Sequence, residues 1–357
     1  MSSQRSIIIF NHAMSSEATK KCYLNELKRF KEFYKIRDYD SLTTIEPKKL
    51  QIMIEDYIMQ RKGKVERSSL SHSLSALDLF FSMNDVILNF KKSKKLIPKQ
   101  ETKQAGMRAY TVDEVSELLQ SCKTFVHKVI INVMASSGVR AGFIEDLKIK
   151  HLKDMPLGCK AITVYADTVY EYTTFMTPEA SANLEQYFTW RKKKGEVLGP
   201  ESFVFITEKR KCFTAGGLST LLNRLVKDTT IVRTKTHRNR YDIMSAHGLR
   251  KFFDTTLKLN QNLNPSVVER LLSHKSKAIR LDSSYFRPRE SDLFEVYQKA
   301  IPSLTIDKSS RLEFELKENK DRLEKLENSK DRRILELESD MRLIKEFAKS
   351  IRKETLS

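Results

Sequence analysis

Along most of this chain, apolar side chains recur every three or four residues, which is the spacing of one face of an α-helix. In the stretch SSEATKKCYLNELKRFKEFYK that face carries Tyr23, Leu27, Phe30 and Tyr34, and similar stripes follow as far as about residue 98. The 357 residues include only ten glycines and eight prolines, the residues that most often interrupt helices. We therefore expect a mainly helical protein.

One segment departs from this pattern. The sequence AITVYADTVYEYTTFMT is rich in Thr, Val and Tyr, which favours a β-hairpin that turns near Ala166–Val169. Pro178 directly afterwards is expected to start a helix. Upstream, Thr111 and Glu114 have the spacing of a capping box, so another helix should begin there. The predicted fold class is mainly α with a small β-hairpin or sheet.

Composition changes along the chain indicate four parts. We expect a helical first unit over residues 1–98 and a larger second unit over residues 109–306. The stretch KKSKKLIPKQETKQAGMR carries seven Lys or Arg against a single acid, Glu101, and a basic linker is assigned to residues 99–108. Such a linker can follow a phosphate backbone, although a solvated hinge is the alternative.

The last part, residues 307–357, is charged and should be helical. Its apolar residues follow a coiled-coil seam that breaks at Lys330 and Arg333 and resumes in a shifted phase. The seam residues are Leu312, Leu316, Leu323, Leu326, Leu337, Met341, Ile344 and Ala348. Self-association through this tail is one interpretation, and a solvated single helix is the other.

Charge and cysteine content limit the possible functions. The net charge is +19, and because the tail has 14 Lys or Arg against 13 Asp or Glu, nearly all of it belongs to residues 1–306. A body this basic usually binds a polyanion, and nucleic acid is favoured over a membrane surface. No apolar run is long enough to span a membrane. The four cysteines form no CxxC pair, so neither zinc nor a disulfide framework is expected. These features predict a cytoplasmic, nucleoid-associated protein.

Four short motifs occur in a fixed order in the second unit. They are SSGVRAGF with Arg140, HGLRK with His247 and Arg250, LLSHKS with His274, and SSYFRP with Tyr285. Each is weak alone, since a lone histidine or tyrosine is usually structural. Their joint occurrence in a basic chain is much more specific.

With these motifs the sequence resembles the tyrosine recombinase, or phage integrase, family over residues 15–305. The segment YEYTTFMTPEA is similar to archaeal and mobile-element members. The resemblance implies that residues 1–98 form a helical, DNA-binding core-binding domain and residues 109–306 a catalytic domain, and that the two together clamp duplex DNA. It also implies that Arg140, His247, Arg250 and His274 form the catalytic set, with Tyr285 as the nucleophile.

The residue types suit phosphoryl transfer. Two guanidiniums can clamp the non-bridging phosphate oxygens through planar, paired donors. A phenol with a pKa of about 10 needs a base, and His247 can fill that role. His247 and Arg250, three apart on a helix, share one face and can reach one phosphate. His274 would donate a hydrogen bond to the phosphate, and no cofactor or metal is expected.

The sequence departs from the family pattern at two places. Phe143 stands where members often have an acidic residue, a role that Glu145 could take over. Val169 lies near the expected place of the hairpin lysine that protonates the leaving oxygen, and Lys160 only begins the hairpin. The leaving-group acid is therefore unassigned. His274 and Tyr285 are also eleven residues apart, slightly more than is usual in the family.

Each assignment has a structural alternative. Arg140 could pair with Glu145 or Asp146, His247 could cap its helix, and His274 could be a charge at a helix end. Tyr297 rivals Tyr285 but lies in an apolar stripe and should be core.

The predicted function is a site-specific recombinase or integrase of a mobile element or virus, acting as a homo-tetramer on double-stranded DNA. The alternatives are a type IB topoisomerase-like enzyme and a non-cleaving DNA-binding relative.

Overall fold

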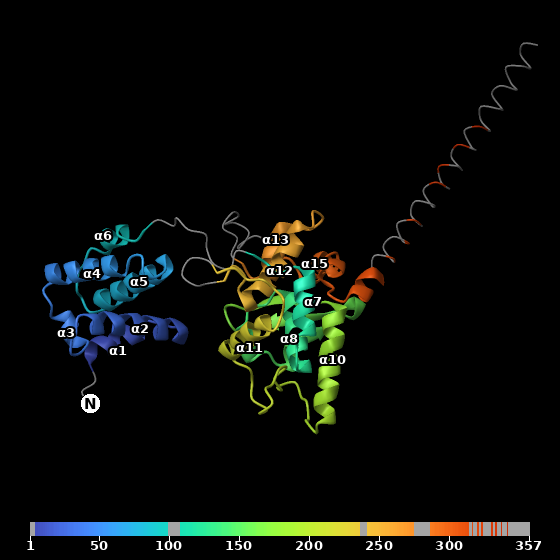
Figure 1. Ribbon diagram of the computed structural model, residues 1–357, viewed down its shortest axis with the longest axis horizontal. Coiled ribbons are helices and arrows are strands. Elements are labelled where there is room, and N and C mark those ends of the chain that lie inside the picture. Colours follow the sequence, from blue (N-terminus) through green and yellow to red (C-terminus); the bar gives the residue numbers. More distant parts are fainter. Residues whose placement is uncertain are drawn as a thin grey trace, which may run out of the picture. The chain divides into compact units, whose positions relative to one another are not determined.

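The computed structural model describes residues 4–98, 108–235, 241–274 and 286–313, together with isolated positions of the tail between 316 and 341. The chain divides into two compact units, Met1–Lys103 and Gln104–Ser357 (Figure 1). No helix among the described residues is long and apolar enough to cross a bilayer. The mainly helical fold with a small sheet confirms the predicted fold class.

The first unit is entirely helical over its described residues. Its helices are α1 (Arg5–His12), α2 (Glu17–Phe33), α3 (Asp40–Thr43), α4 (Pro47–Arg61), α5 (Arg67–Met83) and α6 (Phe90–Lys95). The stripe predicted on α2 is confirmed, because Leu27 and Phe30 are fully buried and Tyr23 and Tyr34 pack beside them. Phe30 meets Tyr57 of α4 edge to face, with ring centroids 5.1 Å apart.

A polar network lies inside this helical unit. The carboxylate of Glu26 accepts hydrogen bonds from Arg29 and Arg61, and Ser73 donates to the same carboxylate. Because these partners stabilise the charged form, the pKa of Glu26 is lowered even though burial opposes this. The network joins α2, α4 and α5 without leaving a charge unpaired.

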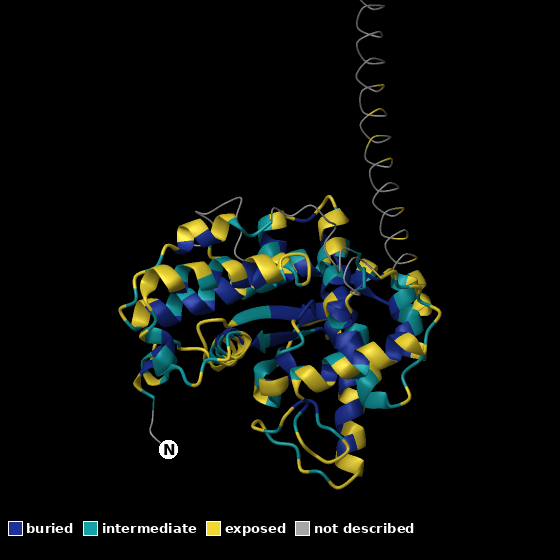
Figure 2. Ribbon diagram, turned by 60° about the vertical axis from the view of Figure 1, so that its left-hand side comes forward, coloured by how far each residue is buried: buried dark blue, intermediate teal, exposed yellow. Residues whose placement is uncertain are grey.

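In the second unit, three helices and one strand pack against a single buried helix. Its elements are α7 (Val112–Gln120), α8 (Phe125–Ser137), α9 (Phe143–Asp146), η1 (Ile149–His151), β1 (Leu152–Asp154), η2 (Pro156–Gly158), β2 (Lys160–Val164), β3 (Tyr172–Met176), α10 (Pro178–Lys193), α11 (Ala215–Lys227), α12 (Ser245–Leu259), α13 (Pro265–Leu271), α15 (Glu290–Gln298) and α16 (Ile301–Leu304). Helix α8 is buried at every residue from Val129 to Ser137 and contacts α7, α10, α12 and β3. The outer helices bury one face and expose the other (Figure 2).

The predicted hairpin and helix starts are confirmed. Strands β2 and β3 pair antiparallel from Lys160↔Met176 to Val164↔Tyr172, so the turn spans residues 165–171. The short strand β1 adds to the other edge of β2 and gives the sheet order β1-β2-β3. Pro178 is the first residue of α10, and Thr111 and Glu114 form both bonds of the capping box of α7.

The end of the second unit is tied to its core. Tyr297 of α15 is fully buried and donates a hydrogen bond of 2.8 Å to the carbonyl of Ser136, so its predicted place in the core is confirmed. Ile301, Leu304 and Ile306 are buried, and the backbone N–H of Ile306 donates to Glu179. The hydrogen bond to Glu179 therefore fixes the start of the tail against α10.

Candidate active site

The first arginine of the candidate site is delivered by the end of α8. Gly138 ends that helix with φ of +65°, a left-handed conformation that costs glycine little. A Cβ at this position would lie 2.8 Å from Cγ of Phe253 and 2.9 Å from Cδ2 of Leu272, so the backbone also needs glycine for close packing. The chain turns away from the core here, and Arg140 two residues later is exposed.

The second arginine lies on α12, whose apolar face packs on α8. Arg250 is only 2 % exposed, and its Nη1 donates a hydrogen bond of 2.6 Å to the carbonyl of Gly138. Its Nη2 donates to the carbonyl of Leu272. Burial and the positive charge of Arg140 lower the pKa of Arg250, but an arginine stays protonated at neutral pH. Backbone carbonyls therefore hold this cation in place.

Arg140 and Arg250 meet at one cavity of about 840 Å³. Arg140 Nη2 lies 3.4 Å from the carbonyl of Ser273, next to the Leu272 carbonyl that Arg250 uses. No carboxylate among the described residues lies within ion-pair distance of either guanidinium. The predicted alternative of an Arg140 pair with Glu145 or Asp146 is thus not observed, and Glu145 instead accepts from the backbone N–H of Ala215 at the start of α11.

His247 lines the same cavity as the two arginines. It lies in the first turn of α12, three residues before Arg250, and makes no helix-capping hydrogen bond. Although the side chain is exposed, the protein around it still removes solvent, and this effect lowers its pKa together with the charges of Lys251, Arg250, Arg140 and His274. A neutral imidazole beside two cations is the form that a general base requires. We call Arg140, His247, Arg250 and their cavity the cationic site.

His274 follows the end of α13, close enough for its charge to affect His247. Its Nδ1 and Oε2 of Glu269 are 2.8 Å apart, and Glu269 also pairs with Lys258 at 2.5 Å. Burial lowers the pKa of His274, as does the charge of Arg250, while Glu269 acts in the opposite direction. A neutral ring that donates from Nδ1 to Glu269 presents Nε2 as an acceptor, and protonation would make Nε2 a donor.

Two of the sequence predictions fall partly or wholly outside the described residues. Tyr285, the predicted nucleophile, lies in the segment 275–285, so its distance from the arginines is not described. The sequence RTKTHRNR, from Arg233 to Arg240, is a basic run before the His247 motif that would suit a loop on DNA or a solvated insertion, and it is described only as far as Lys235. Within that described part, the Arg233 guanidinium stacks 4.1 Å from the centre of the Tyr241 ring, and both residues line the cavity.

The hairpin supplies no ammonium to the site. The fully described turn 165–171 contains no lysine, and Val169 at its tip is 93 % exposed. Lys160 lies at the opposite end of β2, where it pairs with Asp154 and with Glu185 at 2.8 Å. This lysine is therefore occupied in structural ion pairs away from the turn.

The sequence analysis missed several residues of the cavity wall. Ser219, Asn223 and Lys227 of α11 face the same space as His247, and Asn223 accepts a hydrogen bond of 2.9 Å from Ser245. Helical spacing alone could have suggested them, since the three residues are four apart on α11. The sequence did not show which face of α11 turns toward the arginines.

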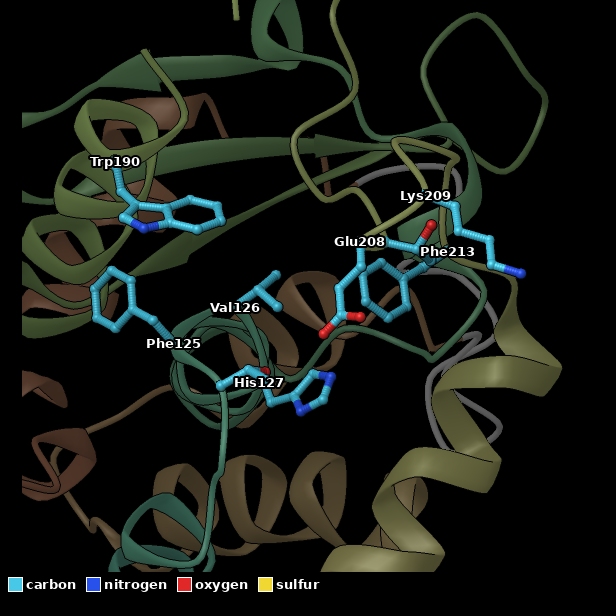
Figure 3. A pocket seen from close by; sticks show the side chains of 9 residues that line it. Phe125, Val126, His127, Trp190, Glu208, Lys209 and Phe213 are labelled. Carbon is cyan, nitrogen blue, oxygen red and sulfur yellow. The ribbon is translucent and has the colours of Figure 1, made fainter. Parts of the chain in front are cut away.

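A separate cavity of about 550 Å³ lies on another part of the second unit. In Figure 3 the Trp190 ring faces Phe125 and Val126, and the carboxylate of Glu208 points toward the His127 ring. Burial lowers the pKa of His127, and Glu208 opposes this shift. Of the predicted catalytic residues that the structure describes, none lines this cavity, and its described wall is mainly apolar.

Comparison with known families identifies the chain. The model of the phage integrase family matches residues 108–290, and that of the phage integrase N-terminal SAM-like domain matches residues 9–84. The chain belongs to the phage integrase family. It is a tyrosine-type site-specific recombinase, as its motifs predicted. A search of curated proteins found no match to the chain.

Solved structures of integrases and recombinases share the fold. The Tn1549 transposon integrase in complex with circular intermediate DNA aligns with a TM-score of 0.55 at 17% identity, covering 82% of this chain and 99% of that chain. XerH recombinase bound to its difH substrate gives 0.53 at 19% identity, covering 77% of each chain. A lambda integrase tetramer bound to a Holliday junction gives 0.53 at 17% identity, covering 77% and 76%.

Proposed function

We propose that this integrase-family chain cuts and rejoins duplex DNA through a covalent 3′-phosphotyrosine at Tyr285. The observation that carries the proposal is the meeting of Arg140, His247 and Arg250 at one cavity, with no carboxylate among the described residues neutralising the arginines. A phosphodiester supplies the missing negative charge. The planar donors of the two guanidiniums fit its non-bridging oxygens.

The proposed step is a transesterification. His247 accepts the phenol proton of Tyr285, and the phenolate oxygen attacks the scissile phosphorus. A bond from phosphorus to the tyrosine oxygen forms, the bond to the 5′ oxygen breaks, and that oxygen takes up a proton. Arg140 and Arg250 stabilise the negative charge that spreads over the phosphate in the transition state. His274, held by Glu269 through Nδ1, is protonated in this step and donates a further hydrogen bond from Nε2 to a phosphate oxygen.

The same step runs in reverse when a 5′ hydroxyl attacks the phosphotyrosine, with His247 returning the proton. Because the phosphate stays in an ester linkage throughout, rejoining needs no ATP.

In this proposal residues 1–98 bind DNA as the core-binding domain, residues 99–108 link it to the catalytic domain at residues 109–306, and a homo-tetramer joins two duplexes. We further propose that the protein integrates or excises the DNA of a mobile element or virus, and that it acts at the nucleoid.

A nicked duplex tests the chemistry. Binding sites are selected from a random duplex pool, and a nick is placed beside each candidate cleavage position so that the short cleaved strand diffuses away. The wild-type chain should form an adduct that survives denaturant, and Tyr285→Phe should lose the adduct but keep its DNA affinity. The Tyr297→Phe variant is a matched control, because its hydroxyl is buried against Ser136 and it should still form adduct.

The outcomes separate the alternatives. Wild-type protein that binds the selected site but never forms an adduct would be a non-cleaving DNA-binding relative. Adduct formation with relaxation of supercoiled DNA, and no strand exchange between two duplexes, would favour a type IB topoisomerase-like enzyme. Adduct formation by Tyr285→Phe would refute the assignment of the nucleophile.

A further inference from the structure

The end of α13 brings His274 next to the cationic site. The carbonyl of Leu272, just past the helix, accepts a hydrogen bond from Nη2 of Arg250. The carbonyl of Ser273 accepts one of 3.4 Å from Nη2 of Arg140. His274 follows directly in the chain, so its side chain leaves a backbone that both guanidiniums contact.

The same helix end turns the chain back, so that residue 274 lies against residue 269. Ser273 has φ of +51°, a left-handed conformation that commonly ends a helix. The N–H of His274 donates to the carbonyl of Glu269, and the N–H of Ser273 donates to that of Arg270, both at 2.9 Å. These two bonds form a Schellman motif, in which side chains five positions apart meet, often through apolar groups. Here the pair is polar, and Nδ1 of His274 lies 2.8 Å from Oε2 of Glu269.

Helix α12 holds Glu269 from the other side. Nζ of Lys258 lies 2.5 Å from Oε1 of Glu269 and 2.8 Å from Oδ1 of Asp254. Each oxygen of the Glu269 carboxylate therefore has its own partner, Lys258 or His274. Burial raises the pKa of Glu269, but these two partners lower it by more, so the pKa lies below its usual value. The carboxylate is thus charged throughout the pH range in which a histidine titrates.

Opposing charges surround the His274 ring. The charged or titratable groups near it are Arg250, Asp254 and Lys258 of α12, His247 at the start of that helix, and Glu269 of α13. Burial lowers the pKa of His274, as does the charge of Arg250, whereas Glu269 and Asp254 raise it. The net pKa is lowered, so the ring of the free protein is neutral at pH 7. An anion bound to Arg250 would offset the cation that opposes protonation and leave the two carboxylates to favour it.

We propose that Glu269 is a positioning residue, which binds Nδ1 of His274 and supplies the negative charge that lets the ring take up a proton when a phosphate binds. The proposal rests on the proposed function, in which His274 donates to the scissile phosphate. The proton comes from solvent and adds to Nε2, which then donates to a phosphate oxygen, while the Nδ1 hydrogen stays on Glu269. Lys258 keeps the carboxylate in place, and Glu269 does not touch the substrate.

The His274 ring can be titrated by NMR in the full chain without DNA. Histidine-labelled protein has seven rings, and His274→Gln identifies the signal of residue 274. Sulfate is the probe, because its charge stays constant over the titration. In the wild type the pKa of His274 should lie below 6.5 in the free protein and rise by about one pH unit with sulfate bound. In Glu269→Gln it should be about one pH unit lower than in the wild type in both states.

The chain offers a matched control for the loss of this carboxylate. Glu185 shares Lys160 with Asp154, as Glu269 shares Lys258 with Asp254, but Lys160 is not part of the cationic site. The Glu185→Gln variant should leave the pKa of His274 unchanged. The other histidine signals show whether each variant keeps its fold.

The pH profile of adduct formation distinguishes this role from a structural one. Donation from Nε2 requires a protonated His274, so the rate on the nicked duplex falls as the pH rises through the pKa of that ring in the complex. Loss of the Glu269 charge lowers this pKa. The alkaline limb of Glu269→Gln should therefore move about one pH unit toward lower pH. Because glutamine keeps the size and an oxygen that accepts from Nδ1, the missing charge is the main difference. A rate reduced equally at every pH would indicate a structural role and overturn the proposal.

The two levels of inference fail separately. If wild-type protein forms no adduct with a proven binding site, the proposed function fails, while the titration still measures how Glu269 acts on His274. Three NMR results would overturn the role of Glu269: the same His274 pKa in Glu269→Gln and the wild type, a wild-type pKa that sulfate does not change, or a neutral wild-type ring whose nitrogen shifts place the proton on Nε2.

Discussion

Arg250 Nη1 donates a hydrogen bond of 2.6 Å to the carbonyl of Gly138, which lies 112 residues earlier in the chain. Gly138 ends α8, and Arg140 follows two residues later. The bond therefore joins the segments that carry the two cations, so the position of one guanidinium depends on the backbone that delivers the other. The end of α8 therefore supports both cations of the site.

Replacing Gly138 by alanine should destabilise the second unit and reduce phosphate binding. The left-handed backbone costs an alanine about 1–2 kcal/mol. The clash with Phe253 and Leu272 should add roughly 1–3 kcal/mol of overpacking. Chemical denaturation of Gly138→Ala and of the control variant below, each compared with the wild type, measures the change in the free energy of unfolding. Gly195→Ala is the matched control, because φ there is +78° but nothing lies within 4 Å of an added Cβ, so only the backbone cost should appear.

The rate of adduct formation should fall as the pH is lowered, and the midpoint of this fall should lie below 6.5, the ordinary pKa of histidine. The surrounding protein removes solvent from His247, and together with the charges of Lys251, Arg250, Arg140 and His274 this lowers its pKa, so the ring stays neutral until the pH falls below the lowered pKa. Activity as a base is thus present above the lowered pKa and lost as the pH falls through it. Single-turnover rates measured from pH 4.5 to 8 (roughly two units on each side of 6.5) give the profile. An acid limb above 6.5 would contradict this assignment, and Arg140→Gln should move the limb upward.

Lys227 should contribute to DNA affinity without reading base sequence. Its side chain is exposed, lines the cationic site and forms no ion pair among the described residues, so a phosphate is a suitable partner. Lys227→Met should weaken binding about equally for selected and random duplexes and reduce the slope of log affinity against log salt by about one. Fluorescence anisotropy at several salt concentrations measures both. Lys123→Met, which removes a lysine paired with Asp228 at 3.3 Å, is the control.

Removing residues 307–357 should lower the association state and leave the fold intact. Ile306 is buried and its N–H reaches Glu179, so truncation after this residue keeps the end of the core. The described seam residues Leu312, Leu316, Leu323, Leu337 and Met341 are exposed, which leaves an apolar stripe for a partner helix. Light scattering with and without the tail gives the mass. An unchanged mass would remove the idea of tail-mediated assembly.

Local signals explain which parts of the fold could be predicted. The capping box at Thr111, the helix start at Pro178 and the hairpin around Val169 each depend on a few adjacent residues. The buried stripe of α2 depends only on helical spacing. The basic stretch after residue 90 was harder, because Phe90–Lys95 is a helix whose Phe90 and Ser93 are buried against the rest of the first unit. That packing is tertiary and leaves no periodic signal.

In the cationic site, too, the contacts between distant segments could not be predicted from the sequence. The motifs predicted Arg140, His247 and Arg250, and the structure brings these three together. The sequence did not show that backbone carbonyls hold Arg250, or that Glu145 accepts a hydrogen bond from the backbone at the start of α11. These contacts join segments that are far apart in the chain, so only the folded backbone determines them.

The unneutralised pair of guanidiniums also bears on how the protein could be engineered. Two repelling cations held by neutral partners make the empty molecule less stable than its fold allows. A carboxylate introduced within ion-pair distance of both guanidiniums would relieve this repulsion and would also neutralise the charge that a phosphate needs. Selection for thermal stability alone would therefore favour substitutions that remove the activity at this site. A search for more thermostable variants should leave the surroundings of Arg140 and Arg250 unchanged.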